Sequence, residues 1–332
     1  MPDLLVKIKK AGLVGRGGAA FSTAKKWEAL KASKSKIKYL VCNASEGEPG
    51  VKKDYHILDN YLWELFDGLF LTADYFNIKN IYFLINPDYY RKFSCKLKKQ
   101  AKDFKLDIDF IIKEQHSYIS GEESALLNYI EGKKAEPRLK PPYPIEIGLF
   151  GCPTLVHNVE TLYNISLVNS NQYRQERFYT INLERDFKKV IILPENYTIA
   201  KILQVANLYP SFDFFVQVGG DAAGEVLNKK QLNRLATGAG SITIYPKSGH
   251  NPLALLEYWL GFYKNQSCGQ CTACREGSYR LFEIIKSKKP DWALFLELVD
   301  NLEQTSFCGL GLSIPVPIKS YLKNIGLFYE KH

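Results

Sequence analysis

The 332-residue chain has a single methionine, no long apolar run and no internal repeat. No stretch approaches the roughly 18 consecutive apolar residues that a membrane-spanning helix requires. Its first residues, MPDLLVKIKKAG, lack the apolar core and the cleavage site of a secretory signal peptide. Hydrophobic residues nevertheless make up 46% of the chain, as in proteins with a buried core. We therefore expect a soluble, cytoplasmic protein that does not insert into a membrane.

Cysteine is also scarce, with seven residues in the whole chain. In a reducing compartment cysteines seldom form disulfides and more often bind metals. The net charge of +9 would suit nucleic acid, anionic lipid or an acidic protein. The basic residues are scattered, however, and their densest runs, at 31–38 and 96–102, are typical of solvated helix faces. We therefore do not expect nucleic acid as a partner.

The first half of the chain alternates between short apolar runs and helical stretches. Strands are predicted at KYLVCNA, at 81–86 and at 108–112. Helices are predicted after the glycine-rich segment GLVGRGGAAF, at 56–76 and at 89–104. This alternation indicates a mostly parallel α/β sheet over residues 1–168.

The second half has a different pattern. Short strands dominate residues 169–248, joined by turns and by one helix, TIAKILQVAN, which indicates a small α+β domain. Residues 249–332 have the periodicity of successive helices. We therefore predict three domains, at 1–168, 169–248 and 249–332.

Three of the seven cysteines lie in the segment SCGQCTACREG, at Cys268, Cys271 and Cys274. Zinc sites usually combine two separated pairs of ligands, whereas Cys-x2-Cys-x2-Cys with a distant fourth cysteine is typical of a [4Fe–4S] cluster. Cys308, in SFCGLG, is the candidate fourth ligand, and its neighbouring glycines would let backbone N–H groups approach the cluster. The pattern favours a [4Fe–4S] cluster over zinc.

Glycines and carboxylates form a second group of candidate residues. A glycine loop that opens a helix presents N–H groups to a phosphate, and Lys25 or Lys26 would add a charge. Carboxylates in the segments NASEGEPG and YISGEESALLN could hydrogen-bond ribose hydroxyls or a flavin ring; they are Glu46, Glu48, Glu122 and Glu123. The alternative is that each glycine makes a turn and each glutamate caps a helix.

Taken together, these segments resemble the 51 kDa-type NADH-binding flavoprotein subunit of respiratory complex I and its relatives in NAD-linked hydrogenases and formate dehydrogenases. The resemblance extends from residue 11 to about 325 and is carried by AGLVGRGGAAFSTAKKW, KYLVCNASEGEPGVKKD, the segment from YISGEES to KPPYP, and the cysteine motif. It implies an α/β flavin-binding domain, an α+β ubiquitin-like β-grasp (SLBB-type) insert and a C-terminal all-α helical bundle that carries an iron–sulfur cluster.

The resemblance also implies roles for individual residues. Glu48 and Glu123 would be catalytic. The residues implied to bind FMN or nicotinamide nucleotide are Gly15, Arg16, Gly17, Phe21, Lys26, Asn43, Ser45, Glu46, Tyr118, Gly121, Glu122, Tyr143, Asn158 and Thr161. The cluster ligands would be the four cysteines already named. Four positions depart from the family pattern: the family usually has Gly at Ala20, an aromatic residue at Ala29, Asp at Ser45 and Asn at His157.

The resemblance implies an oxidoreductase subunit that takes a hydride from NADH onto FMN and passes single electrons to the [4Fe–4S] cluster and to partner subunits. One expected partner is a [2Fe–2S] subunit of thioredoxin-like or ferredoxin type, with attachment to the cytoplasmic face of the inner membrane through partners. Three alternatives stay open: a relay subunit that does not oxidise NADH, a non-catalytic scaffold, and a zinc or nucleic-acid-binding module.

Overall fold

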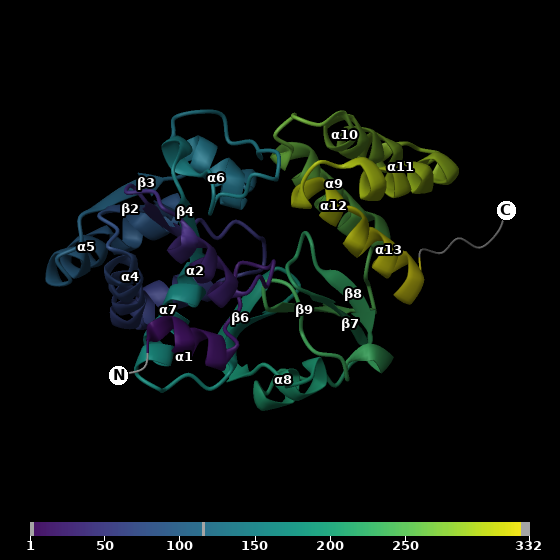
Figure 1. The fold of residues 1–332 in the computed structure, drawn as a ribbon. Coiled ribbons are helices and arrows are strands. Elements are labelled where there is room, and N and C mark those ends of the chain that lie inside the picture. The colour runs from purple at the N-terminus through teal and green to yellow at the C-terminus, as the bar shows by residue number, and fades with distance from the viewer. Residues whose placement is uncertain (1–2, 115–116, 327–332) are drawn as a thin grey trace. The chain divides into compact units, whose positions relative to one another are not determined.

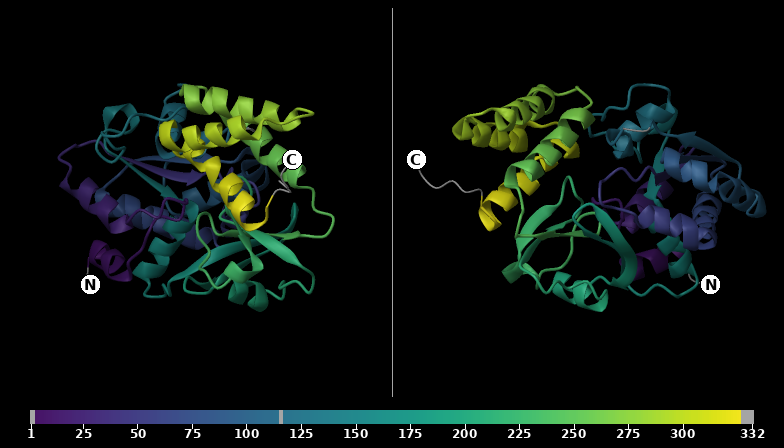
Figure 2. Two further views of the ribbon diagram at one scale, coloured as in Figure 1. Left: turned by 90° about the vertical axis from the view of Figure 1, so that its right-hand side faces the viewer. Right: turned by 180° about the vertical axis from the view of Figure 1, so that it is seen from behind.

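The computed structural model describes residues 3–114 and 117–326, which form two compact units. The first comprises Met1–Gly47 and Lys52–Glu176, and the second comprises Glu48–Val51 and Arg177–His332. The four residues Glu48–Val51 thus interrupt the first unit in sequence and belong to the second. Figures 1 and 2 show the helices and strands of both units.

The first unit contains a four-stranded parallel sheet in the order β3-β2-β1-β4. Its strands are β1 (Tyr39–Ala44), β2 (Asn80–Ile85), β3 (Ile108–Ile112) and β4 (Thr154–Asn158). Three consecutive residues of β1, Leu40 to Cys42, are fully buried, because helices cover both faces of the sheet. The predicted parallel α/β sheet is confirmed.

Helices join these strands and cover the sheet. They are α1 (Leu4–Ala11), α2 (Thr23–Ala32), α3 (Lys53–Asn60), α4 (Leu62–Phe76), α5 (Pro87–Asp103), α6 (Glu123–Ile130) and α7 (Val159–Asn169), with short 3-10 turns η1 (Ile119–Gly121) and η2 (Leu149–Gly151). On one face, Leu126 and Leu127 of α6 pack on Val41 and Val156. On the other, Phe66 of α4 stacks on a β2 ring, with centroids 6.2 Å apart.

The single helix predicted at 56–76 is two helices, α3 and α4, which meet at Tyr61. Tyr61 has φ −132° and ψ 36°, outside the helical range, and its backbone N–H closes α3 by donating to Ile57 O. The apolar periodicity of the two helices is continuous in sequence, so the pattern does not reveal the break.

The second unit contains a five-stranded mixed sheet in the order β6-β5-β9-β7-β8. Its strands are β5 (Glu176–Leu183), β6 (Asp186–Pro194), β7 (Phe214–Val218), β8 (Glu225–Asn228) and β9 (Ser241–Pro246). β5 and β9 are parallel, while β7 is antiparallel to both β8 and β9. Helix α8 (Ile199–Val205) packs its apolar side chains into the core of this sheet, with Ile199, Ile202 and Leu203 buried.

A short 3-10 turn, η3 (Lys229–Gln231), follows β8. After β9 the rest of the described chain is helical. The helices are α9 (Pro252–Gln266), α10 (Thr272–Lys286), α11 (Trp292–Thr305), α12 (Gly309–Ser313) and α13 (Pro315–Asn324). Helix α10 packs against α9 and α11, and α13 packs against β8. The short helix α12 was not predicted, because two of its five residues are glycine.

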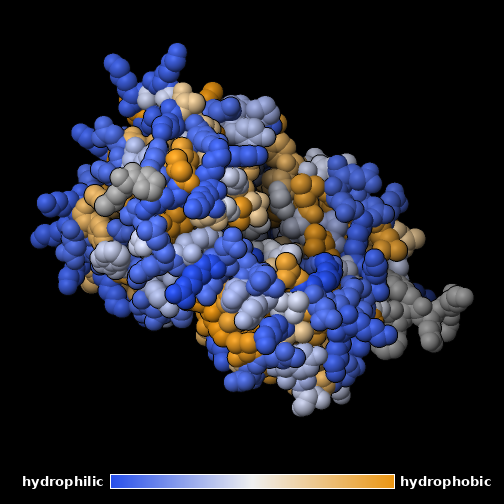
Figure 3. Space-filling model, turned by 60° about the horizontal axis from the view of Figure 1, so that its bottom comes forward, coloured by the Kyte–Doolittle hydropathy of each residue, from blue (hydrophilic) through white to orange (hydrophobic). Residues whose placement is uncertain are grey.

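In the described part of the chain, no helix is long and apolar enough to cross a membrane. On the face shown in Figure 3, hydrophilic residues predominate and hydrophobic ones form small groups.

The contact between α4 and α7 depends on Gly68. A Cβ atom at this position would lie 1.9 Å from the backbone oxygen of Leu162, and backbone cannot move aside as a side chain can. We predict that Gly68→Ala lowers the free energy of unfolding by about 1–3 kcal/mol, measured by urea denaturation. The control is Asp74→Ala, at an exposed position of α4, which we expect to change it by less than about 0.5 kcal/mol. An equal effect of both variants would contradict the close-approach argument.

Candidate cofactor sites

The glycine-rich loop lies between α1 and α2 and is closed at its base. Val14 and Ser22 form an isolated antiparallel bridge, and Gly15 N–H donates to Phe21 O at 2.8 Å. The backbone N–H of Arg16 donates to Thr161 Oγ1 at 3.0 Å, which joins two of the residues predicted to bind flavin. Residues 17–21 are exposed. An open glycine loop at the start of a helix fits the predicted binding of a phosphate group.

Lys26 lies one turn into α2 and points toward α6. Its Nζ donates to Val156 O at 3.3 Å and forms an ion pair with Glu123. An ammonium group has three donors, so a third remains for a phosphate oxygen. The structure thus brings together two predicted site residues that are 97 positions apart in the sequence.

Of the two adjacent glutamates at the start of α6, Glu122 is the helix cap. Its carboxylate accepts the backbone N–H groups of Ser124 and Ala125, at 2.8 and 2.9 Å, and it pairs with Lys140. Glu123 lies in the first turn and pairs with Lys26 instead. The helix-cap alternative therefore holds for Glu122, while Glu123 keeps a partly exposed carboxylate.

Asn43, Ser45 and Gly121 form a tight cluster at the carboxyl end of β1. Asn43 Nδ2 donates to Gly121 O at 2.9 Å, and Ser45 Oγ donates to Asn43 Oδ1 at 2.6 Å. A Cβ atom at position 121 would lie 2.8 Å from Ser45 Oγ, so the approach requires glycine. Asn158, at the end of the adjacent strand β4, caps α7 and donates to Asn43 O at 3.3 Å.

A buried ion network supports Asn158, and the sequence analysis missed it. Lys53 Nζ donates to Asn158 Oδ1 at 2.8 Å and to Asp54 Oδ1 at 2.6 Å, and it lies 3.4 Å from Glu160 Oε2. Burial alone would lower the pKa of Lys53, but Asp54 and Glu160 outweigh it and hold that pKa above its ordinary value. The signal was present in the motif GEPGVKKD, whose lysines and aspartate directly follow the acidic turn.

Glu46 stabilises the start of α3. Its carboxylate accepts the backbone N–H of Asp54 at 2.9 Å and the hydroxyl of Tyr89 at 2.6 Å. Next to it lies Lys113, whose pKa is lowered to about 8 by burial, against the opposing effect of Glu46. Tyr118 lies beside Lys113, since a Cβ atom at Gly47 would be 3.0 Å from Lys113 Nζ and 3.3 Å from the Tyr118 ring.

Two aromatic rings predicted to contact nucleotide are accessible. Phe21 and Tyr143 are each 53% exposed. Phe21 ends the glycine loop, and Tyr143 lies in a turn held by Glu146, whose carboxylate accepts the Tyr143 N–H at 3.0 Å. Exposed rings on loops with fixed backbones are suited to stacking on a planar base.

Glu48, the second predicted catalytic residue, belongs to the second unit. Its Oε1 accepts the backbone N–H groups of Ala222 and Ala223, at 2.9 and 3.0 Å. The first unit holds the remaining predicted flavin and nucleotide residues.

The four cysteines of the predicted cluster lie in one neighbourhood of the second unit. The pKa of Cys274 is raised to about 11, mainly by burial and also by the other three cysteines nearby. A hydrogen bond with the Ser267 hydroxyl lowers it in part. Burial also raises the pKa of Cys308. The backbone N–H groups of Leu310 and Gly311 donate to its sulfur and lower this pKa, but burial has the larger effect. Thiols with raised pKa values release protons when they bind metal.

The surroundings of Cys308 fit a thiolate ligand of an iron–sulfur cluster. The backbone N–H groups of Leu310 and Gly311 donate to its sulfur, and such hydrogen bonds from the surrounding protein are typical of cluster sites.

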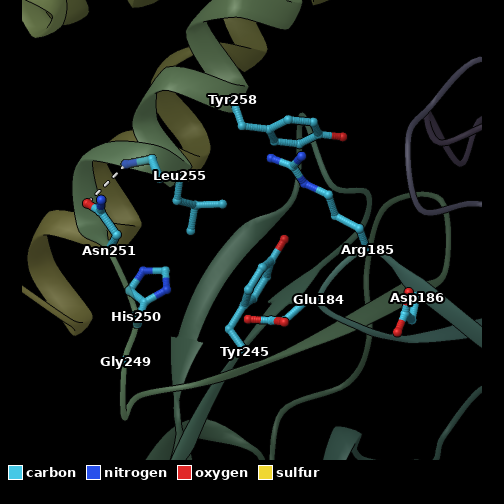
Figure 4. A pocket seen from close by; sticks show the side chains of 10 residues that line it. Glu184, Arg185, Asp186, Tyr245, Gly249, His250, Asn251, Leu255 and Tyr258 are labelled. Atoms are coloured by element: carbon cyan, nitrogen blue, oxygen red, sulfur yellow. Dashed lines mark hydrogen bonds between the residues drawn. The ribbon is translucent and has the colours of Figure 1, made fainter.

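A separate pocket of about 310 Å³ lies between the β5–β6 turn and the start of α9. Figure 4 shows Arg185 beneath the ring of Tyr258, 4.5 Å from its centroid, with the Tyr245 hydroxyl pointing toward both. No residue that was predicted from the sequence lines this pocket.

Comparison with known proteins identifies the family. The model of the Nuo51 FMN-binding domain matches residues 8–167, and that of the NADH-ubiquinone oxidoreductase-F iron–sulfur binding region matches residues 254–332. The F subunit of the NADH-quinone oxidoreductase of Rickettsia bellii (strain OSU 85-389) is 30% identical, in a match that covers 97% of this chain and 88% of the relative. The chain belongs to this family. The corresponding protein of Aquifex aeolicus (strain VF5) is 28% identical, with 99% and 86% of the two chains covered.

A solved structure supports the fold. The crystal structure of an NAD+-reducing [NiFe]-hydrogenase in the H2-reduced state superposes with a TM-score of 0.89 at 26% identity. The match covers 97% of this chain and 60% of the hydrogenase chain, so this chain spans less than two thirds of that protein.

Family membership confirms the predicted cofactors FMN, [4Fe–4S] and NADH, and the predicted role in electron input. The chain is a subunit of a multi-subunit redox complex. The roles of individual residues and the three domain boundaries stay predictions.

The cluster assignment predicts the effect of removing Cys308. We expect Cys308→Ala, purified without oxygen, to contain less iron and acid-labile sulfide than the parent, because three ligands hold a cluster less firmly than four. It should also unfold at a lower temperature, because cluster binding contributes to folding. The control is Cys95→Ala, which removes an exposed cysteine outside the cluster region. Unchanged iron and sulfide in Cys308→Ala would exclude this residue as a ligand.

His157 predicts a pH dependence of stability. It is buried and accepts the Trp27 Nε1–H at 3.0 Å; burial, together with Lys26, lowers its pKa to about 3. Below about pH 6.5 His157 takes up a proton in the unfolded chain but stays neutral in the folded chain. The free energy of unfolding therefore decreases as the pH falls from 6.5 toward 3.

We expect His157→Asn to remove this cost. The loss of unfolding free energy between pH 7 and pH 5, measured by urea denaturation, should be smaller in the variant by on the order of 1–2 kcal/mol. Equal losses in the two proteins would show that His157 does not titrate in this way.

Proposed function

We propose that the first unit binds FMN and nicotinamide nucleotide through the residues named above, and that the cysteines of the second unit hold the cluster that receives the electrons. The observation that carries this is the convergence of four distant segments around the carboxyl end of β1: the glycine loop, the acidic turn, the start of α6 and the start of α7. Ligands of open α/β sheets bind at this edge, outside the carboxyl ends of the strands.

Each group of residues has a distinct task. The amide of Gly17, with Lys26, holds the FMN phosphate, since together they provide an N–H group and a charge at a helix start. The amides of Gly15 and Arg16 keep the loop in shape by their bonds to Phe21 O and Thr161 Oγ1. Asn43 and Ser45 orient the flavin ring by hydrogen bonds. Asn158 supports them by holding the end of β1, because its amide is already bonded to Asn43 O, Asp54, Lys53 and the Glu160 N–H. Bound FMN supplies a ring that accepts a hydride and releases electrons singly.

Glu123, Phe21 and Tyr143 position the nucleotide. The carboxylate of Glu123 accepts ribose hydroxyls, and the exposed rings stack on the base or the nicotinamide. The role proposed for Glu48 rests on the sequence resemblance alone; within the second unit its Oε1 accepts the amides of Ala222 and Ala223. These residues bring the nucleotide into a defined orientation, which is the main contribution a protein makes to hydride transfer.

The finer architecture is part of this proposal. The mixed sheet with α8 over residues 169–248 is a ubiquitin-like β-grasp insert of SLBB type, and residues 249–332 form the helical bundle of the cluster. Residues 1–168 form the flavin domain. The five-stranded sheet whose core α8 covers and the succession of helices from α9 support this division.

We further propose that a [2Fe–2S] subunit of thioredoxin-like or ferredoxin type is a partner, and that the complex lies on the cytoplasmic side of the inner membrane. A cluster near the protein surface needs an acceptor within reach, and Phe307, next to Cys308, is 37% exposed. Pull-down with mass spectrometry and fractionation of the native source test these two points.

The direct test of the function is anaerobic mixing of purified protein with NADH. The flavin absorbance should bleach first, and the broad cluster absorbance should follow. FMN that is present but stays oxidised with millimolar NADH and NADPH would refute hydride input.

The role of Glu123 predicts a separation between nucleotide affinity and flavin content. We expect Glu123→Gln to raise the KM for NADH about 10-fold or more, since a hydrogen bond to a charged group contributes about 1.5–3 kcal/mol. FMN content and thermal stability should stay near those of the parent. The matched control is Glu28→Gln, which removes a carboxylate from another lysine–glutamate pair, Lys9–Glu28 on α1 and α2. A KM equal to that of the parent, with a loss of stability, would instead indicate a structural role.

A further inference from the structure

The acidic segment Glu48–Val51 is held in the second unit by several hydrogen bonds. Asp221 N–H donates to Pro49 O at 2.9 Å, and Asn182 Nδ2 donates to Gly50 O at 2.8 Å. Gly50 has φ +75°, and a Cβ atom there would lie 2.3 Å from the Asp221 carboxyl carbon, so only glycine allows this approach. With the two amides that reach Glu48, the segment is fixed at both backbone and side chain.

The loop that binds Glu48 is itself bound by a buried tyrosine of α9. The hydroxyl of Tyr263 lies 3.1 Å from Ala222 O and 3.0 Å from Ser313 Oγ, and the residue has no exposed surface. The N–H group of Ala222 therefore donates to the Glu48 carboxylate, and the carbonyl group of Ala222 accepts the Tyr263 hydroxyl. One peptide residue separates the acidic segment from Tyr263.

On its other side Tyr263 contacts the helix that follows Cys308. Ser313 is the last residue of α12, and its Oγ donates to Leu310 O at 2.8 Å within the same helix. The first amides of α12, those of Leu310 and Gly311, donate to the Cys308 sulfur. Gly311 is packed against the cluster region, because a Cβ atom there would lie 3.2 Å from Cys274 Cβ.

Two hydroxyl protons serve three contacts in this chain. If Tyr263 donates to Ala222 O, it can accept from Ser313, and the bond from Ser313 to Leu310 O is then given up. If Tyr263 donates to Ser313, that serine can donate to Leu310 O, and the bond to Ala222 O is given up. In the structure each hydroxyl donates to its own carbonyl, Tyr263 to Ala222 O and Ser313 to Leu310 O. Rotating the Ser313 hydroxyl toward Tyr263 gives up the bond on the Cys308 side, and rotating the Tyr263 hydroxyl toward Ser313 gives up the bond on the Glu48 side.

We propose that Tyr263 is a positioning residue that couples the acidic segment to the cluster helix α12 through this exchange. A change at Glu48 alters the bonds available to Ala222, and Tyr263 transmits it to Ser313 and the amides that face Cys308. Coupling of this kind requires contiguous contacts and an element with two arrangements, and the hydroxyl pair has both. The consequence rests on the proposed function: a nucleotide at Glu48 acts on the surroundings of the cluster.

A double-mutant cycle on the cluster-loaded protein tests this coupling. The four proteins are the parent, Glu48→Ala, Tyr263→Phe and the double variant, and the measurement is amide hydrogen exchange of peptides covering residues 309–314. The amides of Leu312 and Ile314, bonded to Cys308 O and Gly311 O, report the opening of α12. Double-mutant cycles isolate the interaction between two positions.

In the parent background we expect Glu48→Ala to speed this exchange about fivefold, the effect of about one neutral hydrogen bond. In the Tyr263→Phe background the same substitution should have no effect. Equal ratios in the two backgrounds, or no effect of Glu48→Ala in the parent, would overturn the proposal.

Tyr321→Phe is the matched control. Tyr321 is also fully buried in the second unit, but its hydroxyl bonds His250 at 2.9 Å. The effect of Glu48→Ala should persist in this background, and its loss there would show that any buried hydroxyl serves equally, which also overturns the proposal. If Tyr263→Phe does not fold, Ser313→Ala replaces it in the cycle, because Ser313 is the next residue in the same series of hydrogen bonds.

Iron and sulfide contents of the same samples test the ligand role of Cys308 separately. The exchange ratios do not depend on NADH oxidation, so failure of the proposed function and failure of the coupling give different results.

Discussion

Hydrogen bonds within the second unit hold Glu48–Val51, four residues whose neighbours in the sequence belong to the first unit. This segment follows Glu46 and Gly47 of the first unit, and after it Lys52 leads to Lys53 and its buried ion network. Its own bonds are made to Asn182, Asp221, Ala222 and Ala223. The segment is therefore fixed within the second unit by bonds to both its backbone and the Glu48 side chain, and Gly50 is the position within it that admits no side chain.

The parallel sheet could be predicted because its signals are local. Buried strands of β-branched and aromatic residues alternate with amphipathic helices, and this alternation alone indicates a parallel α/β sheet. The break at Tyr61 and the helix α12 could not be predicted in the same way. The first is a change of backbone angles within a continuous periodic pattern, and the second is a glycine-rich turn of helix next to Cys308.

The candidate cluster ligands could be predicted because the spacing Cys-x2-Cys-x2-Cys is itself typical of a cluster. Elsewhere residue type alone could not separate function from structure. Glu122 and Glu123 are adjacent and chemically equal, yet Glu122 caps α6 while Glu123 pairs with a lysine 97 positions away. Tyr263 and Ser313 were missed for a similar reason: a tyrosine in an apolar helix is normally core, and its hydroxyl partners come from distant segments.

The fold accommodates three of the four departures from the family pattern, at Ala20, Ser45 and His157; nothing in the structure explains Ala29. Ala20 has φ +49°, a left-handed conformation that glycine adopts without strain, which explains why glycine is usual here. Alanine adopts the same conformation with some backbone strain. Ser45 donates to Asn43 Oδ1, and Asn43 in turn binds Gly121 O, so the tip of the acidic turn stays ordered without a carboxylate. His157 is neutral and accepts from Trp27. Of these three positions, only Ser45 stands where the family usually has a charged residue, so only this substitution removes a charge from the acidic turn and changes the electrostatic field around it.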